Sequence, residues 1–381
     1  MTETKKIIRN FATLEYLPPG SMVCLFGAGE GGSISKKILE EYNRNFKIIY
    51  FIDSHKKGQK DGIEIISPQE LKKSNSKCDM ILITSERYEE IEKVLESLNI
   101  KDYMIFNSAA FKGCIYTEDE KRKNENLFEK VKGILHHKRD RELFDLIIDQ
   151  RSIKSRRRTD FLRHVMPVEK QYLDFINTNC IKTIIEGGVS NGQNTYDFSK
   201  FPGKDLHIYG FEPSLDALKN GRYYPLLKNN RNIQMFPLAL WKYKTTLRLF
   251  DDGTRSKIIE TMQEEKAGNI QNVDAVSIDE FVDEKKIQKV DFIKMDIEGS
   301  EMEALNGAIK TLSAHRPQLA ISIYHGKKHL YEIPLFLDSV LENYIYKLGH
   351  YHPHYVETIL YAIPEEIYEE SDINRFELQF H

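Results

Sequence analysis

The sequence predicts an α/β protein built from two Rossmann-like, doubly wound sheets in tandem. Three observations support this prediction. Short apolar segments alternate with amphipathic ones through most of the 381 residues, which is typical of parallel sheets covered by helices. Two of these segments run directly into glycine-rich loops, at Gly27 and at Gly187. A strongly charged stretch without proline separates the two series, and the chain is long enough for two domains.

The first series covers residues 1–115 and contains four short, mostly apolar strand candidates. Apolar residues at helical spacing follow the first and the third of them. The expected strands are MVCLF, KIIYFID, DMILIT and YMIF. The change to charged sequence predicts connecting helices over 116–160, where apolar residues recur at three- and four-residue steps. Residues 161–381 are expected to form the second domain.

The first glycine cluster has the spacing of a nucleotide-binding loop. Gly27, Gly29 and Gly32 fit G-x-G-x-x-G between a strand and a helix, and Asp53 ends the following strand. Glycines let the backbone approach a ligand closely, the helix start supplies amide donors, and the carboxylate can accept ribose hydroxyls. These residues are candidates for binding a nucleotide sugar or another substrate. Binding of NAD(P) and a structural remnant without a ligand remain open as alternatives.

The second series begins near Met166 and contains six strand candidates. They are KTIIEGG, HIYGFEP, NIQMFPLAL, VDFIKMDIEG, QLAISIYH and ETILYAIP. Between the third and the fourth, TLRLFDD and AVSIDEF predict a hairpin and a short helix. Open parallel sheets bind ligands at the carboxyl ends of their strands. The residues that follow these segments are therefore the candidates for a site.

Three successive strand ends carry residues suited to a nucleoside cofactor without a pyrophosphate. Glycines permit close backbone approach, an acid at the end of the second strand can accept both ribose hydroxyls, and small or apolar residues suit an adenine face. The candidates for cofactor binding are Glu186, Gly187, Gly188, Val189, Ser190, Asn191, Gly192, Thr195, Glu212, Pro213, Ala239 and Leu240.

The fourth strand candidate carries a cluster of ionisable residues. By the two-residue period of a strand, Lys294, Asp296 and Glu298 share one face, while Glu301 is expected to cap or begin the following helix. Carboxylates gathered at a strand end are candidates for a general base, and we expect Asp296 and Glu298 to be catalytic. Lys294 is a candidate for substrate binding, as is Tyr324 at the end of the next strand.

Histidines supply further candidates for a base at neutral pH. His325 follows the fifth strand candidate and His350 precedes a tyrosine, and both are expected to be catalytic. His350, His352 and His354 alternate as metal ligands on one strand would, but Pro353 interrupts that strand. No metal site is therefore predicted.

The segments that carry these residues resemble a known family over residues 165–365. The resemblance is to FkbM-type S-adenosylmethionine-dependent methyltransferases, and it is carried by IIEGGVSNGQNT, IYGFEPS, AVSIDEF, VDFIKMDIEGSEMEALNGA, RPQLAISIYHGKKHL and GHYHPHYVETILYAIP. It implies that 186–192 and Glu212 hold S-adenosylmethionine, and that Asp296 and Glu298 lie at the methyl-transfer end. The sequence departs at Glu186, where the family commonly has aspartate. The resemblance also implies methylation of a hydroxyl, often on a sugar.

The glycine segment of the first domain is similar to the nucleotide-sugar-binding domains of sugar acyltransferases. Together the two resemblances imply a methyltransferase that acts on a hydroxyl of a sugar or glycan precursor in polysaccharide biosynthesis, with a nucleotide sugar as a further ligand. Two alternatives stay open. One is an NAD(P)-dependent sugar-modifying oxidoreductase, and the other is a non-catalytic sugar-nucleotide-binding protein.

Composition excludes several classes of protein. The 55 basic and 58 acidic residues give a formal net charge of −3, which argues against binding nucleic acid over the whole chain. Mean hydropathy is −0.50, and neither a bilayer-length apolar run nor an apolar signal core is present. The four cysteines form no CxxC pair, so reduced thiols and a cytoplasmic location are expected. The sequence leaves the oligomeric state open, a homo-oligomer included.

Overall fold

The computed structural model describes residues 17–41, 45–73, 78–85, 88–106, 116–152, 158–202, 205–214, 219–251, 256–259, 269–352 and 355–368. The chain divides into two compact units. The first comprises Met1–Asn126, Glu142–Met166 and His352–Val356, and the second comprises Leu127–Arg141, Pro167–Tyr351 and Glu357–His381. The domain boundaries expected at residues 115 and 160 stay a prediction.

The first unit contains a six-stranded sheet in the order β3-β4-β2-β1-β5-β6. Its strands are β1 (Met22–Phe26), β2 (Lys47–Ile52), β3 (Gly58–Lys60), β4 (Ile63–Ile66), β5 (Met80–Ile83) and β6 (Tyr103–Ile105). Its helices are α2 (Glu30–Glu41), α3 (Pro68–Lys73) and α4 (Tyr88–Ser97). All pairings are parallel except β3 with β4. The four strands expected from the sequence are present.

The core of the first unit lies around the central strands. Apolar runs such as β1 are buried on both faces because helices cover a parallel sheet on each side. The buried cluster contains Leu17, Val23, Leu25, Ala28, Leu39, Phe51, Leu82 and Phe106. At Gly32 the helix α2 lies so close to the sheet that a Cβ would stand 2.1 Å from the carbonyl oxygen of Gly27. Glycine is therefore needed here for helix–strand packing.

Three helices occupy the charged stretch between the two series, as expected. They are α5 (Glu118–Ile134), α6 (Lys138–Gln150) and α7 (Arg158–Arg163). Thr117 and Glu120 form a capping box at the start of α5, in which each side chain accepts from the other residue's amide. Phe128 and Val131, three residues apart, form the buried side of that helix.

The second unit contains a seven-stranded sheet in the order β16-β17-β15-β14-β7-β8-β9. Its strands are β7 (Thr183–Gly187), β8 (His207–Phe211), β9 (Ile233–Phe236), β14 (Phe292–Met295), β15 (Gln318–Ser322), β16 (Tyr344–His350) and β17 (Thr358–Pro364). Its helices are α8 (Gln193–Phe198), α10 (Tyr224–Leu227), α11 (Ile278–Lys285), α12 (Glu301–Asn306), α13 (Ile309–His315) and α14 (His329–Val340). Short 3-10 turns are η3 (Val168–Lys170), η4 (Thr178–Cys180) and η6 (Glu365–Ile367). Strand β17 is antiparallel to both of its neighbours, β15 and β16, and the other neighbouring pairs in this sheet are parallel.

A smaller sheet of four strands, in the order β10-β13-β11-β12, interrupts the series. It is formed by β10 (Ala239–Leu240), β11 (Thr245–Asp251), β12 (Ser256–Ile259) and β13 (Asn269–Val276). The expected hairpin is β11 with β12, and β13 leads into the expected short helix α11. Ser277 and Glu280 cap that helix reciprocally.

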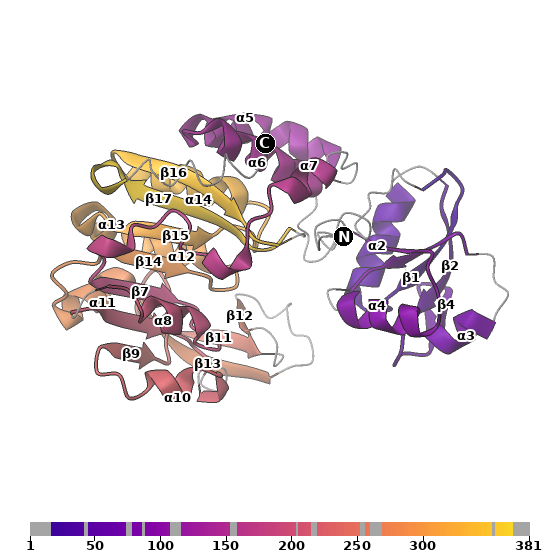
Figure 1. Ribbon diagram of the computed structural model, residues 1–381, viewed down its shortest axis with the longest axis horizontal. Helices are drawn as coiled ribbons and strands as arrows, with labels where there is room; N and C mark the ends of the chain where they lie inside the picture. The colour runs from indigo at the N-terminus through magenta and orange to yellow at the C-terminus, as the bar shows by residue number, and fades with distance from the viewer. Residues whose placement is uncertain are drawn as a thin grey trace. The chain divides into compact units, whose positions relative to one another are not determined.

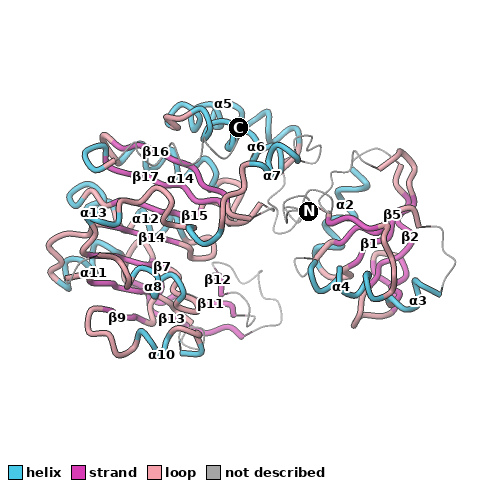
Figure 2. Tube along the Cα trace, in the orientation of Figure 1, coloured by secondary structure: helices cyan, strands magenta, loops and turns pink. Residues whose placement is uncertain are grey.

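The order in which strands are added to the seven-stranded sheet changes side at β7. From β7 the chain moves outward through β8 to β9, and it returns to the other side of β7 with β14 and then β15 (Figure 1). Figure 2 shows helices flanking the strands in both units. The predicted α/β class of two Rossmann-like sheets is confirmed. The carboxyl ends of β7 and β14 form the switch point, where such sheets hold their ligands.

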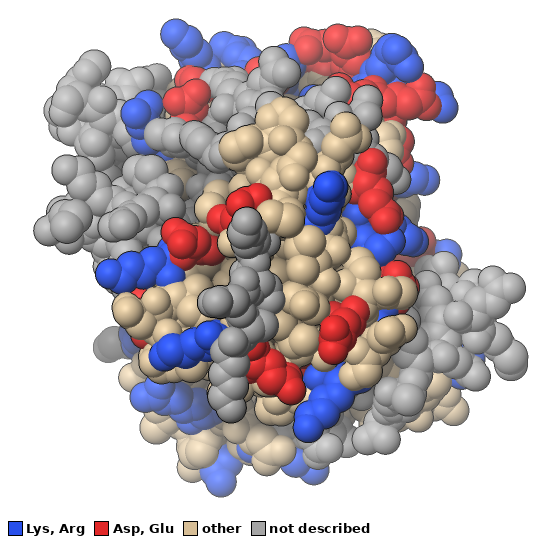
Figure 3. Space-filling model, turned by 90° about the vertical axis from the view of Figure 1, so that its right-hand side faces the viewer, with Lys and Arg blue, Asp and Glu red and all other residues tan. Residues whose placement is uncertain are grey.

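Charge is distributed without a dominant sign on the face drawn in Figure 3. Basic and acidic side chains of the described residues alternate there among uncharged ones. Among the described helices, none combines the length and the apolar character that crossing a bilayer requires.

Candidate functional site

The loop after β7 has a backbone that requires glycine. Gly188 has φ +77°, and a Cβ on it would lie 1.8 Å from the carbonyl oxygen of Asp296. Gly192 has φ +81° and is the residue before α8. A Cβ on Gly187 would lie 2.9 Å from a methyl group of Leu240. The glycines therefore bring the end of β7, the end of β14 and the short strand β10 into direct contact.

The amide groups of this loop are used inside the protein. Gly188 and Val189 donate to the carbonyl of Phe211 in β8, and Gly192 donates to the carbonyl of Val189. Ser190 donates its amide to the carboxylate of Glu212 at 3.0 Å. A loop whose amides are already bonded is poorly suited to cradle a pyrophosphate, which needs amide donors.

Two fully buried ionisable residues support the loop from below. Lys294 donates from Nζ to the carbonyl oxygens of Gly187, at 3.1 Å, and of Gly188, at 2.7 Å. Its Nζ lies 3.9 Å from the carboxylate of Glu186, which accepts from Thr195 Oγ1 at 2.6 Å. Burial raises the pKa of Glu186 to about 7, although Lys294 and Thr195 oppose the shift. These side chains shape the loop without reaching the surface.

Glu212 lies at the end of β8, as predicted, and is almost buried. Its two oxygens accept the amides of Ser190 and Ser214, each at 3.0 Å. The carboxylate therefore holds the loop after β7 and the turn after β8. Of the other cofactor candidates, Ser190 and Asn191 are exposed, Pro213 is half-buried, and Val189, Thr195, Ala239 and Leu240 are buried.

Asp296 follows β14 and stands among aromatic hydroxyls. Tyr172 donates to one carboxylate oxygen at 2.7 Å, and Tyr324 donates to the other at 3.2 Å. Burial, followed by the charge of Asp296, raises the pKa of both phenols well above 10. The two tyrosines therefore remain donors at neutral pH and fix the direction of the Asp296 carboxylate.

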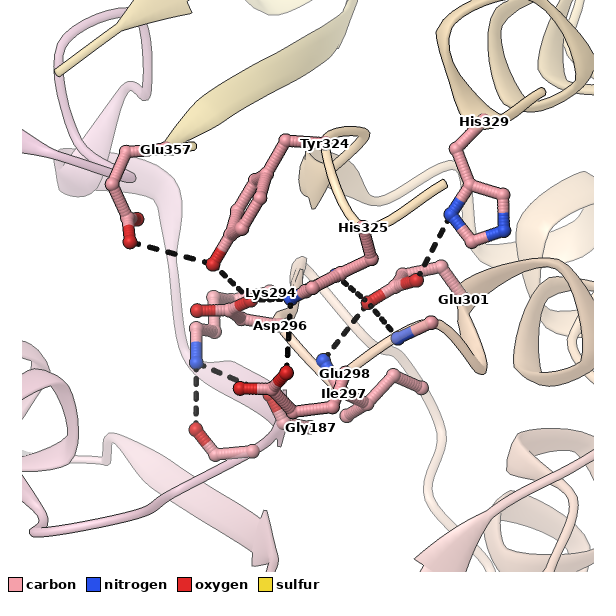
Figure 4. A network of polar contacts seen from close by, with 12 residues as sticks. Gly187, Lys294, Asp296, Ile297, Glu298, Glu301, Tyr324, His325, His329 and Glu357 are labelled. Atoms are coloured by element: carbon pink, nitrogen blue, oxygen red, sulfur yellow. Dashed lines mark hydrogen bonds and ion pairs between the residues drawn. The ribbon is translucent and has the colours of Figure 1, made fainter. Parts of the chain in front are cut away.

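His325 lies after β15 with its ring between acidic groups (Figure 4). Its Nδ1 is 2.9 Å from Glu301, and its Nε2 is 3.4 Å from Asp296 and 3.7 Å from Glu298. Burial would lower the pKa of His325, but Glu301 and then Asp296 and Glu298 raise it to about 9. The ring is charged at neutral pH in this state of the protein.

Glu301 begins α12, as expected, and is fully buried. Its carboxylate accepts the amide of Ile297 at 3.0 Å and that of Gly299 at 3.4 Å, and it lies 3.3 Å from His329 Nδ1. Burial would raise the pKa of Glu301, but His325 and His329 hold it well below the usual range. Glu301 therefore stays ionised and fixes the orientation of His325.

Glu357 was not identified from the sequence as a site residue, yet it joins this cluster. It accepts from Tyr324 at 3.4 Å and from the Gln171 amide group. Burial and the neighbouring charge of Asp296 raise the pKa of Glu357 to about 7. Tyr172 was missed as well, because it lies in the irregular segment before β7. The one sequence signal was for Glu357, which opens the ETILYA segment.

His350 has its contacts elsewhere. It ends β16, is fully buried, and its Nδ1 lies 2.8 Å from Thr358 Oγ1 in β17. Its catalytic role stays a prediction. His352 follows the strand, whereas Pro353 and His354 lie outside the described residues.

The acid of the first unit also holds its own glycine loop. Asp53 accepts the amides of Ala28, at 3.0 Å, and of His55 and Lys56 just after it. Burial would raise the pKa of Asp53, but these amides lower it. Lys60 Nζ donates to the carbonyls of Ala28, at 3.0 Å, and of Gly29, at 2.6 Å. The substrate-binding roles of Gly27, Gly29, Gly32 and Asp53 stay predictions.

Family models match both units. Residues 186–349 match the methyltransferase FkbM domain. The matched segment contains the glycine loop, Glu212, Asp296 and His325, and it supports an S-adenosylmethionine-dependent methyltransferase. Residues 21–106 match the family described as C2185-like, N-terminal, which leaves the likeness to nucleotide-sugar-binding domains a prediction. The comparison with curated proteins gives no match.

One solved structure shares the fold over most of the chain. The crystal structure of methyltransferase FkbM from Methylobacillus flagellatus has a TM-score of 0.61 and 18% identity, over 95% of this chain and 94% of that chain. A putative rRNA methylase from Clostridium thermocellum has a TM-score of 0.32 and 14% identity, covering 51% of this chain and 92% of that one. Aeropyrum pernix fibrillarin with bound S-adenosyl-L-methionine has a TM-score of 0.32 and 11% identity, covering 49% and 69%. The last two likenesses are too distant to support an argument.

Proposed function

We propose that this protein transfers the methyl group of S-adenosylmethionine to a hydroxyl of a sugar or glycan precursor. The observation that carries the proposal is the contact between the glycine loop and the acidic cluster. A Cβ on Gly188 would overlap the carbonyl oxygen of Asp296. A ligand on the loop and an acceptor at Asp296 are thereby neighbours, as a transfer reaction between them requires.

The residues around the loop fit this cofactor better than a dinucleotide. Glu212 offers acceptor capacity for ribose hydroxyls at the end of the second strand of the unit. The loop amides are bonded internally, so the site favours a ligand without a pyrophosphate. When bound, S-adenosylmethionine supplies a methyl group on a positively charged sulfur, and the carboxylates at the end of β14 suit that charge.

The acidic cluster suits an acceptor that donates several hydrogen bonds. Carboxylates of Asp296 and Glu298 accept from hydroxyls, and both are partly exposed while His325 is buried beside them. In the proposed reaction the acceptor hydroxyl lies against Asp296 and His325, and Asp296 takes up its proton as the oxygen attacks the methyl group. The tyrosines hold Asp296 in place. A sugar, with neighbouring hydroxyls, is the acceptor class that matches such a surface.

The test measures methyl transfer and cofactor binding separately. The full chain is incubated with methyl-labelled S-adenosylmethionine and fractionated glycan precursors, and cofactor affinity is measured by calorimetry. Asp296→Asn should lower the transfer rate by about 10²–10⁴-fold while cofactor affinity changes little. Asp338→Asn, an exposed position on α14, is the matched control and should behave as wild type.

Two results would overturn the proposal. One is an absence of S-adenosylmethionine binding by the wild-type chain, which would favour a non-catalytic protein or a nicotinamide-dependent one. The other is an unchanged transfer rate in Asp296→Asn at saturating cofactor. Label appearing on a nitrogen or carbon atom of the product would reject the hydroxyl as acceptor.

A further inference from the structure

Two carboxylates face the same imidazole nitrogen, one after β14 and one in the turn before α12. His325 Nε2 lies 3.4 Å from Asp296 Oδ1 and 3.7 Å from Glu298 Oε2 (Figure 4). Metal–ligand bonds of about 2.1 Å place neighbouring ligand atoms about 3.0–3.4 Å apart. The observed separations are close to those around a shared ion. Asp296, Glu301 and His325 also form the group of described residues whose atoms lie within 4.8 Å of one another.

The imidazole of His325 is oriented as a ligand is. Its side chain is 4% exposed, and Nδ1 faces the fully buried Glu301 at 2.9 Å. Neither ring nitrogen has a partner with hydrogen-bond geometry among the described residues, and Nε2 points toward Asp296 and Glu298. Histidine ligands characteristically give one ring nitrogen to a carboxylate and the other to the metal. Glu301, held by the amides of Ile297 and Gly299, is that supporting carboxylate.

The backbone turns sharply to bring Glu298 back to His325. Glu298 has φ +53° and Gly299 has φ +103°. A left-handed conformation at glutamate is unfavourable and persists where the surroundings impose it, frequently at functional sites. Its consequence here is that Glu298 Oε2 comes within 3.7 Å of the nitrogen that also faces Asp296. The Glu298 side chain remains 36% exposed, so its carboxylate can be reached from solvent.

Negative charge exceeds positive charge around this point. Three carboxylates, those of Asp296, Glu298 and Glu301, face the two imidazoles of His325 and His329. Carboxylate pairs buried together repel each other unless a cation lies near them. Lys294 is directed to the glycine loop carbonyls instead. A bound cation would neutralise the excess.

We propose that Asp296, Glu298 and His325 bind a divalent cation that accepts both nitrogen and oxygen ligands, with release of the proton on His325 Nε2 and with Glu301 as a positioning residue. Mn²⁺ and Zn²⁺ have this ligand preference. Three protein ligands leave coordination positions open. In a reading that rests on the proposed function, neighbouring hydroxyls of the acceptor occupy these positions and are aligned toward the methyl donor.

The first experiment measures the cation alone. Mn²⁺ is titrated into the chelator-treated full chain without S-adenosylmethionine, and free Mn²⁺ is followed by electron paramagnetic resonance. We expect one Mn²⁺ per chain. Glu298→Gln should weaken its affinity by about 10–100-fold, as should Glu301→Gln through loss of orientation of His325. Glu303→Gln, two residues along α12 and ion-paired with Lys242, is the matched control and should bind as wild type.

Two results would contradict the proposed cation site. One is the absence of Mn²⁺ binding by the folded wild-type chain, and the other is an equal affinity for Mn²⁺ in Glu298→Gln and Glu303→Gln. Circular dichroism of each variant establishes that it is folded. If Glu298→Gln fails to fold, Glu298→Ala is measured in its place, because the Glu298 side chain is partly exposed.

A second measurement separates the cation from the proposed reaction. Calorimetry with S-adenosylmethionine is performed with and without Mn²⁺. Full methyl transfer in the presence of a chelator, with Mn²⁺ binding intact, would reject the role in acceptor alignment and leave the methyltransferase proposal standing. Mn²⁺ binding without any cofactor binding would reject the methyltransferase proposal and leave the cation site standing.

Discussion

The two units use the same arrangement at the end of their first two strands. In each, an acid that ends the second strand accepts an amide of the glycine loop at 3.0 Å: Asp53 accepts from Ala28, and Glu212 accepts from Ser190. Each acid also accepts amides from residues that directly follow it. In both units, the acid at the position where ribose hydroxyls are commonly bound therefore holds the glycine loop by a hydrogen bond to a backbone amide.

The units differ at the strand on the other side of the loop. In the first unit β5 is followed by Thr84, whose hydroxyl donates to the carbonyls of Phe26 and Gly27. In the second unit the neighbouring strand supplies Lys294 for the loop carbonyls and continues into Asp296. The glycine loop and the acid that holds it are thus common to both units. Within the described residues, the strand next to the loop supplies ionisable side chains only in the second unit, at β14.

The largest effects are expected from alanine at Gly188 or Gly32, where a Cβ would overlap a backbone carbonyl. In Gly188→Ala the new Cβ overlaps the Asp296 carbonyl at a strained φ, and we expect loss of about 3 kcal/mol of stability and of cofactor binding. Gly32→Ala overlaps the Gly27 carbonyl and should destabilise the first unit only. Calorimetric unfolding and cofactor titration on the same samples check both. Loss of cofactor binding in Gly32→Ala would break the comparison.

The next effect concerns the paired acids. Glu212→Ala removes the acceptor for the amides of Ser190 and Ser214 and should weaken S-adenosylmethionine binding by at least about 10-fold, or 1.4 kcal/mol. Asp53→Ala disrupts the corresponding bonds in the first unit and should leave that affinity unchanged. Calorimetric titration gives both values. Equal affinities in wild type and Glu212→Ala would remove Glu212 from the proposed cofactor site.

A smaller effect is expected in the pH dependence of stability. The pKa of Glu186 is about 7 in the folded protein and 4.5 in an unperturbed glutamate, so its contribution to stability is fully present below about pH 4.5 and is lost as pH rises through 7. Glu186→Gln keeps an acceptor for Thr195 and removes this loss. The melting temperature of the variant should therefore fall less than that of wild type between pH 5 and pH 8.

The control for this pH effect is Glu284→Gln, which changes an exposed acid of the same unit. It should follow the wild-type curve. Parallel curves for wild type and Glu186→Gln would show that Lys294 keeps Glu186 ionised over the whole range.

The smallest effect is expected at Gly29. A Cβ on this residue would meet no atom within 4 Å, so Gly29→Ala should change the free energy of unfolding by less than about 0.5 kcal/mol. Unfolding in urea measures it. The same variant sharpens the comparison, because weaker binding of a nucleotide sugar to a stable Gly29→Ala chain would identify a ligand that approaches this loop.

The sequence was sufficient for most strands of the sheets and for the strand ends, but β3, β4 and β16 were not among the expected strands. Uniformly apolar runs that end in glycine or an acid, such as those before Gly27 and Gly187, predict buried parallel strands and the residues at their carboxyl ends. Asp296 and His325 were found this way, and the structure brings them together from neighbouring strands.

Contacts made by irregular segments were not predictable. Tyr172 and Glu357 have φ of +69° and +61°, and they reach the cluster from loops that carry no periodic pattern. Their positions depend on tertiary packing. The occupation of Asp53 by backbone amides was missed for a related reason, since a spacing motif does not reveal which atoms satisfy a carboxylate.

The turn at Glu298 and Gly299 fixes the number of residues between β14 and α12. Within six residues the chain leaves the sheet, passes through two consecutive positive φ values and enters α12, so that the acids at 296, 298 and 301 reach a single imidazole. Inserting or deleting one residue anywhere in that interval would swing the later acids away from His325 and move the start of the helix. Length variation among related chains should accordingly be absent from these six positions, even though most of them lie outside regular secondary structure.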